Sequence, residues 1–177
     1  MNHIMEKKVL NLNGKTLKNS NDIWDDSVGK KVWSLISVRG DGYLTVKGGD
    51  VLAKANDCYA ADVRDGAHLI IEDGFWRGNI SSVYVLEGTL EVKGGEFDVI
   101  QPDPTNKDKR FMLNCYDANY RATPRKANII VSGGRFHEFD PGNNLAEGPG
   151  TNFLAPGYKT IMDDNNWYEV VPENVGE

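Results

Sequence analysis

Hydrophobic and polar positions repeat four times along this chain. Each copy has an apolar residue, a spacer, a second apolar residue that is β-branched, another spacer, and a corner that contains glycine. The copies occupy residues 44–49, 69–74, 90–95 and 129–134, at steps of 25, 21 and 39 residues. Alternation with a period of two predicts a strand, and the first two steps are typical of strand-based solenoids. The pattern therefore predicts the same strand on successive coils of a β-solenoid.

Strand geometry assigns the inward face of this repeat. Successive side chains point to opposite faces, so both apolar residues of each copy point inward, as does the apolar residue two positions after each corner. Neighbouring strands lie about 4.8 Å apart, so we expect equivalent residues to stack into ladders. The predicted core ladder consists of Leu44, Leu69, Leu90 and Ile129; Val46, Ile71, Val92 and Val131; and Val51, Trp76, Phe97 and Phe136.

A third strand is predicted before each copy, at residues 32–38, 59–63, 83–86 and 111–116. The first three of these strands end in glycine turns. Three strands in each repeat of 21–25 residues are what a parallel β-helix needs. The expected fold is all-β: a single-stranded parallel β-helix (a β-solenoid, pectate-lyase-like) of about four coils.

The 177 residues predict one domain with three parts. Residues 1–31 form an N-terminal strand and cap, in which residues 9–17 predict a hairpin around Asn13-Gly14. Residues 32–140 form the coils, with a loop insertion at about residues 101–126. Residues 141–177 form a C-terminal capping or attachment module, in which residues 158–162 and 167–171 predict a β-hairpin.

Charge and hydropathy exclude several classes of function. The net charge is −6 and the pI is about 5.1, whereas a nucleic-acid groove needs clustered cations. No run approaches the roughly 20 apolar residues of a membrane span, and residues 1–8 lack the pattern of a secretory signal. We therefore expect neither a nucleic-acid nor a membrane partner, and no export through a signal peptide.

Three outward apolar residues and three cations form the predicted interaction surface. Ile70, Phe75 and Ile130 would be buried in a cyclic homo-oligomer, with a trimer favoured; the alternative is that they are isolated surface residues, which are common. The cations lie in the insertion and are Lys107, Lys109 and Arg110. We expect them to belong to a solvated loop, with a phosphate or an acidic partner as the alternative.

Candidate chemistry is sparse. Cys58 and Cys115 lie two repeats apart, so they are predicted to be buried free thiols, and together with His68 and His137 they lack the paired spacing of a zinc site. No catalytic triad, phosphate-binding loop, metal motif or cofactor site is predicted. A carboxylate pair for glycan chemistry is geometrically possible. However, Lys47, Lys93 and Arg135 lie on the same outward face, and ion pairs with them would explain the acids without catalysis. The outward acids are Asp50, Glu72, Asp73, Glu91, Glu96 and Asp98.

Residues 133–144 (GGRFHEFDPGNN), 146–159 (AEGPGTNFLAPGYK) and 167–172 (WYEVVP) carry a resemblance to a known group of proteins. They resemble a terminal module of β-helical virion appendages, such as head fibres and tail-associated proteins, from phages and prophages of gut Bacteroides-type bacteria. Residues 10–17 resemble the opening strand of pectate-lyase-like β-helices. The resemblance implies a structural protein and assigns no catalytic residues.

The leading hypothesis is a non-enzymatic structural protein of a bacteriophage virion, assembled in the cytoplasm of the bacterial host. It would be a head fibre, capsid decoration or tail-associated module, and its partners would be other capsid or tail proteins. The alternative is a carbohydrate-binding or polysaccharide-degrading protein that reads a host surface glycan, because aromatic faces such as Phe75 and Trp76 can stack on sugar rings. A host-encoded surface adhesin is a third possibility and needs an export signal from elsewhere.

Overall fold

The computed structural model describes residues 6–21, 33–54, 58–102, 110–115 and 126–173, in which every regular element is a β-strand. The expectation of an all-β protein is confirmed. The strands are β1 (Lys7–Lys18), β2 (Ser34–Arg39), β3 (Tyr43–Leu52), β4 (Tyr59–Arg64), β5 (Ala67–Ile71), β6 (Phe75–Gly78), β7 (Val83–Val85), β8 (Gly88–Val92), β9 (Glu96–Val99), β10 (Leu113–Cys115), β11 (Ala127–Val131), β12 (Arg135–His137), β13 (Tyr158–Met162) and β14 (Trp167–Pro172).

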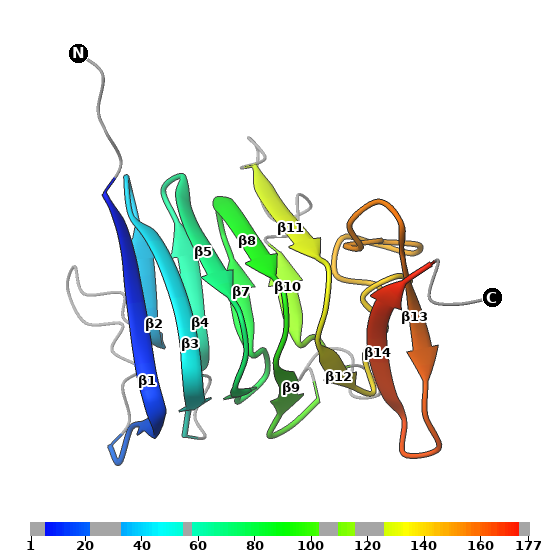
Figure 1. The fold of residues 1–177 in the computed structure, drawn as a ribbon, viewed down its shortest axis with the longest axis horizontal. Coiled ribbons are helices and arrows are strands. Elements are labelled where there is room, and N and C mark those ends of the chain that lie inside the picture. The colour runs from blue at the N-terminus through cyan, green and yellow to red at the C-terminus, as the bar shows by residue number, and fades with distance from the viewer. Residues whose placement is uncertain (1–5, 22–32, 55–57, 103–109, 116–125, 174–177) are drawn as a thin grey trace.

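Two sheets surround one core. The larger sheet has ten strands in the order β11-β8-β5-β3-β6-β9-β12-β14-β13, with β1 also paired to β3. The smaller sheet has the order β10-β7-β4-β2. Figure 1 shows the strands following one another along the long axis, with β1 at one end and the β13–β14 hairpin at the other.

The predicted register of the repeated strands is confirmed. Leu44 pairs with Leu69, Leu69 with Leu90, and Leu90 with Ile129, all between parallel strands. Val46, Ile71, Val92 and Val131 pair in the same way. The strands predicted before each copy are β2, β4, β7 and β10, which also pair in parallel.

Aromatic rings stack at the far side of each corner. Trp76 and Phe97 lie with ring centroids 6.5 Å apart, and Phe97 and Phe136 lie 4.8 Å apart with nearly parallel planes. All three side chains are fully buried, and such pairs add to the stability that burial alone provides. The rest of the core ladder is buried too, except Leu44, which is partly buried against the core.

The predicted fold class, a single-stranded parallel β-helix of about four coils, is wrong. The larger sheet is mixed, because β14 runs antiparallel to both β12 and β13, and it curls into a half-barrel. It is also continuous through the first glycine corner, where a break between two strands was expected. One strand, β3, pairs with β5 through Leu44 and with β6 through Val51, so the sheet bends within a strand.

Glycine permits this bend because the backbones of successive corners approach closely. Gly74 has a φ of 93°, and a Cβ at this position would lie 1.9 Å from the carbonyl oxygen of Gly49 on the neighbouring strand. Gly48 has a φ of 72°, and its Cβ would lie 2.3 Å from Oδ1 of Asn11. Only glycine combines a left-handed backbone with this lack of space.

The N-terminal hairpin predicted around Asn13-Gly14 is also wrong. β1 is one strand that pairs in parallel with β3 on both sides of the corner, and the register shifts between Asn11 and Lys15. Asn13 and Gly14 both have positive φ, as they would in a hairpin turn, but here they form a bulge opposite Gly48. The C-terminal hairpin is confirmed as β13 and β14.

Candidate functional site

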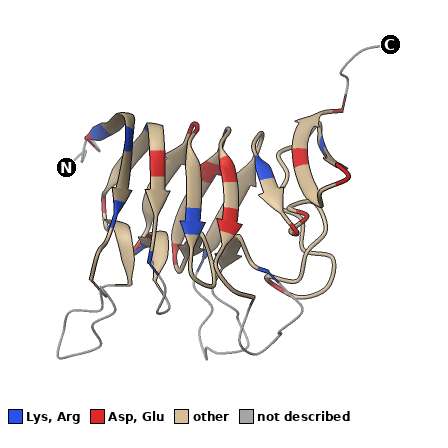
Figure 2. Cartoon of the chain, turned by 90° about the horizontal axis from the view of Figure 1, so that it is seen from below, with Lys and Arg blue, Asp and Glu red and all other residues tan. Residues whose placement is uncertain are grey.

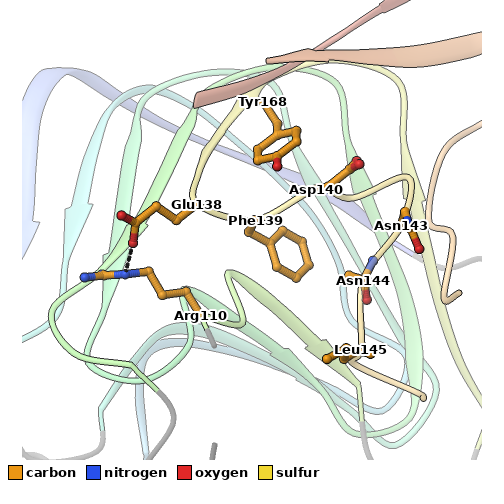
Figure 3. Close-up of a pocket in the computed structure, with 8 residues that line it drawn as sticks. All are labelled: Arg110, Glu138, Phe139, Asp140, Asn143, Asn144, Leu145 and Tyr168. Atoms are coloured by element: carbon orange, nitrogen blue, oxygen red, sulfur yellow. Dashed lines mark ion pairs between the residues drawn. The ribbon is translucent and has the colours of Figure 1, made fainter. Parts of the chain in front are cut away.

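A cavity of about 210 Å³ lies next to the end of β12, where the chain leaves the repeated strands. Figure 3 shows Phe139 near its centre, with Tyr168 of β14 on one side and Arg110 on another. The residues that line it are Arg110, Glu138, Phe139, Asp140, Asn143, Asn144, Leu145 and Tyr168. This volume suits a ligand smaller than a typical drug, so the cavity is the candidate binding site.

An ion pair holds one side of the cavity. Nε of Arg110 lies 2.5 Å from Oε2 of Glu138, and Nη1 of Arg110 donates a hydrogen bond of 3.0 Å to the carbonyl oxygen of Val99 at the end of β9. Glu138 has a φ of 54°, and its backbone N–H donates to the carbonyl oxygen of Asn166 in the hairpin turn. The pair therefore joins β9, the segment after β12, and the hairpin.

A tight turn forms the polar side of the cavity. Oδ1 of Asp140 accepts a hydrogen bond of 2.8 Å from the N–H of Gly142, and the carbonyl oxygen of Asp140 accepts one from the N–H of Asn143. Asn144 is buried, and its Oδ1 accepts from the N–H of Ala146. The structure gives the second carboxylate oxygen of Asp140 and the side-chain amide of Asn143 no partner among the described residues, so these groups are available to a ligand.

Aromatic side chains form the apolar side. Phe139 is 4% exposed, and its ring centroid lies 6.2 Å from that of Phe136 at the end of the core stack. Tyr168 pairs with Phe136 across β12 and β14. A cavity with an aromatic side, a carboxylate and amides can hold a small polar ligand that also has an apolar face, such as one sugar ring.

Charges on the outer face of β9, β12 and β14 form a network beside this cavity. Nη1 of Arg135 lies 2.9 Å from Oε1 of Glu96, and Nη2 lies 2.8 Å from Oδ2 of Asp163 in the hairpin turn. His137 stacks on Trp167 with ring centroids 5.0 Å apart, and its Nδ1 lies 3.1 Å from Oδ1 of Asp98. The network ties the hairpin to the repeated strands.

Asp163 is held in its charged form. Its Oδ1 accepts hydrogen bonds from the N–H groups of Trp167 and Asn165. The pKa of Asp163 lies below its usual value, chiefly because of the hydrogen bond from Trp167. Desolvation opposes this shift, and the hydrogen bond from Asn165 and the contact with Arg135 add to it. A carboxylate that accepts several hydrogen bonds favours ionisation.

The other predicted acids are used in contacts between strands. Asp50 accepts from the N–H of Phe75, and Asp73 accepts from the N–H of Gly48. Glu72 lies 3.8 Å from Lys47. Glu91 lies 2.7 Å from Nε2 of His68, whose ring stacks on Tyr43. These contacts favour a structural role for the outward acids over a catalytic one.

The predicted interaction surface is brought together only in part. Ile70 pairs with Thr45 and Glu91 on the neighbouring strands and is only 7% exposed, so the expectation that it is exposed is wrong. Phe75 and Ile130 are partly buried. Lys107 and Lys109 lie outside the described residues. Arg110 lines the cavity and pairs with Glu138 instead of belonging to a solvated basic patch.

The structure also tests the proposed sugar-stacking residues and the thiols. Trp76 is fully buried, so its ring is not available to a sugar. Cys58 and Cys115 are buried and form no disulfide bond, as predicted. Among the described residues, no group of three His, Cys, Asp or Glu side chains is arranged to hold a metal ion. None of the same residues forms a helix with the length and hydropathy that crossing a membrane requires.

A buried polar cluster in the smaller sheet was not predicted. Asp62 is fully buried and accepts hydrogen bonds of 2.6 Å from Ser34 and 2.7 Å from Ser37. Nε of Arg64 lies 3.0 Å from Oδ1 of Asp62, and the guanidinium lies over the ring of Trp33. Because the carboxylate has several partners within the chain, the cluster holds β2 to β4 and is not a binding site.

Sequence reasoning also missed most of the cavity. Its lining residues follow the last core residue of the repeat, where the spacing pattern ends. The one sequence feature that marks this region is Asp140-Pro141-Gly142-Asn143-Asn144, whose residues favour a turn. This feature does not predict that Tyr168 and Arg110 lie beside the turn.

No known protein family, curated protein or solved structure matches this chain.

Proposed function

We propose that this protein is a non-enzymatic structural component of a bacteriophage particle, either a head fibre or capsid decoration or a tail-associated module that mediates attachment or assembly. The observation that carries the proposal is the core that runs the length of the molecule, in which Trp76, Phe97 and Phe136 stack without interruption. Paired backbones around a continuous core give a rigid rod. Rigidity of this kind suits a particle that meets shear and proteases outside a cell.

Two further features support a structural role. The outward acids and histidines are engaged with neighbouring strands, as Glu96 is with Arg135 and Glu91 is with His68. Of the segments that carry the resemblance to virion appendages, 133–144 and 167–172 supply most of the cavity lining, and 158–159 and 167–172 belong to the terminal hairpin. The proposed attachment region is therefore the end of the molecule that contains β13 and β14.

The test is the composition of purified particles. Particles released from the host that carries this gene would be purified by density gradient and analysed by mass spectrometry. We expect peptides of this chain at a constant ratio to the major capsid protein, and labelling by a specific antibody at one place on the particle. Absence of the chain from intact particles, with the protein present in the lysate, would contradict the proposal.

The cavity favours a second candidate function, the binding of a host surface glycan. Phe139 and Tyr168 supply aromatic surface, and Asp140 and Asn143 supply polar groups at one side. We expect Asp140→Asn, which keeps the turn-forming oxygen but removes the charge, to lose most of any signal on a glycan array, and Tyr168→Phe, which keeps the ring, to retain it. Asp41→Asn is the matched control because Asp41 is not among the cavity-lining residues.

A glycan array without signal for the native protein would remove this second function. A reducing-end assay on the same glycans separates binding from degradation. New reducing ends would contradict the non-enzymatic proposal.

A further inference from the structure

Two strands of the larger sheet that lie at opposite ends of the long axis, β1 and β13, each present an unpaired edge. β1 pairs with β3 on one side, and β13 pairs with β14 on one side; the described residues place no strand against the other edge of either. Figure 1 shows these two strands at opposite ends of the long axis. An exposed strand edge is a template for pairing with another chain.

Exposed apolar side chains concentrate on these same two strands. Within the described part of the chain, five large hydrophobic residues are exposed, and three of them belong to β1 or β13. Val9 on β1 is 62% exposed, and Ile161 and Met162 on β13 are 53% and 55% exposed. Exposed apolar side chains gathered at a sheet edge mark a surface that another chain can cover.

The core ladder ends at an incompletely covered apolar residue on each side, Leu17 on β1 and Met162 on β13. Leu17 on β1 pairs with Val51, which begins the series that continues through Trp76, Phe97 and Phe136. Phe136 pairs with Tyr168, and Tyr168 pairs with Met162. Leu17 is partly buried against the core and Met162 is exposed. The first and last residues of the series are thus both apolar and both incompletely covered.

Strand direction allows the series to continue into another copy. β1, β3, β6, β9 and β12 are mutually parallel, and two antiparallel pairings in succession, β12 with β14 and β14 with β13, restore the same direction in β13. A β1 strand placed beside β13 by repetition along the long axis would therefore pair in parallel, as the other repeated strands do.

Charge separates the two ends. β1 carries Lys7, Lys8, Lys15 and Lys18 and no acidic residue. The hairpin region, residues 158–173, carries Asp163, Asp164, Glu169 and Glu173 and a single lysine, Lys159. Figure 2 shows the basic residues of β1 at one end and acidic residues of the hairpin at the other. Two β1 edges would repel one another, whereas β1 and β13 attract.

We propose that copies of this chain associate head to tail, with β1 of one copy adding to β13 of the next. The contact extends the larger sheet, brings Leu17 of one copy next to Met162 of the other, and brings Lys18 next to the Asp163 turn. A contact between two different surfaces does not close on itself by a two-fold axis, so repetition gives a chain of copies. The proposal does not depend on the assignment to a phage particle.

Two variants block one end each. Lys15→Glu/Lys18→Glu places acids on β1 opposite the acidic hairpin, and Met162→Asp places a charge in the apolar part of the contact. All three side chains are on exposed edge strands, so both proteins should fold, which circular dichroism checks. Sedimentation velocity over a concentration series at low ionic strength should show that native protein associates beyond dimers. Each variant should weaken this association at least about tenfold, and added salt should weaken it in the native protein.

Mixing the two blocked variants gives the sharpest result. Each retains one functional end, and the two ends are complementary, so an equimolar mixture should form a one-to-one heterodimer and nothing larger. Controls are Lys126→Glu and Ile100→Asp, which make the same changes at exposed residues away from β1 and β13 and should associate like native protein.

Three outcomes would overturn the proposal. One is a native protein that stays monomeric at the highest concentration tested. Another is a closed oligomer that neither blocked variant disturbs, as a cyclic trimer through the sheet faces would be. The third is a mixture of blocked variants that stays monomeric, which would indicate contacts between like ends.

Discussion

The repeated strands and the segment that follows them, residues 138–157, are held together by different interactions. In the repeated strands, equivalent apolar residues stack, as Leu69 does with Leu90, and backbone pairing is continuous. In the segment, side chains bond to nearby backbone: Asp140 accepts from Gly142, and Asn144 accepts from Ala146. The first arrangement is rigid and fills its interior. The second leaves a cavity of about 210 Å³.

This difference teaches where a binding function can reside. A ladder of identical contacts leaves no space for a ligand, because each side chain occupies the position that the strand spacing provides. A segment shaped by local hydrogen bonds can surround a space, and here it rests on the last ring of the stack through Phe139 and Phe136. The repeated strands supply the packed core, and the segment supplies the space that a ligand could occupy.

The largest expected effect is the loss of one ring from the stack. Phe97→Ala should lower the free energy of unfolding by about 3–5 kcal/mol, because a fully buried ring leaves a cavity between Trp76 and Phe136. Phe139→Ala is the matched change in the segment and should cost at least about 1 kcal/mol less, because Phe139 already borders empty space. Urea denaturation measures both, and equal losses would contradict the comparison.

The repeated strands were predicted from the sequence more accurately than the rest of the fold. The ladder of Leu44, Leu69, Leu90 and Ile129 was predictable because side-chain alternation and glycine spacing repeat in register. The fold class was not, since nothing in the pattern shows that β3 continues through its corner or that the hairpin adds antiparallel strands.

The hairpin predicted at Asn13-Gly14 failed for a physical reason. An Asn-Gly pair supplies positive φ angles equally to a hairpin turn and to a bulge at a corner, and only the neighbouring strand β3 decides between them. The cavity was missed because contacts such as Arg110 with Glu138 join residues far apart in sequence without a repeated pattern.

The second-largest effect compares ion pairs. Asp62→Asn in the smaller sheet should destabilise the protein by about 3 kcal/mol, because it leaves the buried guanidinium of Arg64 without its counter-charge. Glu138→Gln beside the cavity should cost about 0–1 kcal/mol, because that carboxylate is 44% exposed. Thermal unfolding of both variants measures the two losses of stability. A larger loss for Glu138→Gln than for Asp62→Asn would contradict the view that the ion pair beside the cavity adds little stability.

A smaller effect tests the glycine corners. Gly74→Ala should cost about 2–3 kcal/mol, because it adds a clash with the carbonyl oxygen of Gly49 to the strain of a positive φ. Gly150→Ala in the segment has a similar φ of 81° and nothing within 4 Å, so it should cost about 1 kcal/mol from strain alone. The difference between the two denaturation curves isolates the close approach of the backbones.

The smallest effect concerns the pH dependence of the hairpin turn. Because the folded state lowers the pKa of Asp163, its charge adds stability above the unfolded-state pKa of about 4. That stability is lost as the pH falls through the lower, folded-state pKa. Native protein should therefore exceed Asp163→Asn in melting temperature near neutral pH, and the gap should shrink below about pH 4. A gap that stays constant with pH would show that the charge of Asp163 has no role.

The central claim is that equivalent residues of the repeat lie on neighbouring strands, and a set of cysteine pairs tests it most directly. Residues 47, 72 and 93 occupy the same outward position, each just after one of the paired residues Val46, Ile71 and Val92; residue 47 lies within β3, and residues 72 and 93 directly follow β5 and β8. Oxidation should form disulfides in Lys47→Cys/Glu72→Cys and Glu72→Cys/Lys93→Cys, since adjacent strands lie about 4.8 Å apart. Lys47→Cys/Lys93→Cys should remain reduced at about 10 Å, while the native thiols stay buried. A disulfide between residues 47 and 93, with none between neighbours, would contradict the account.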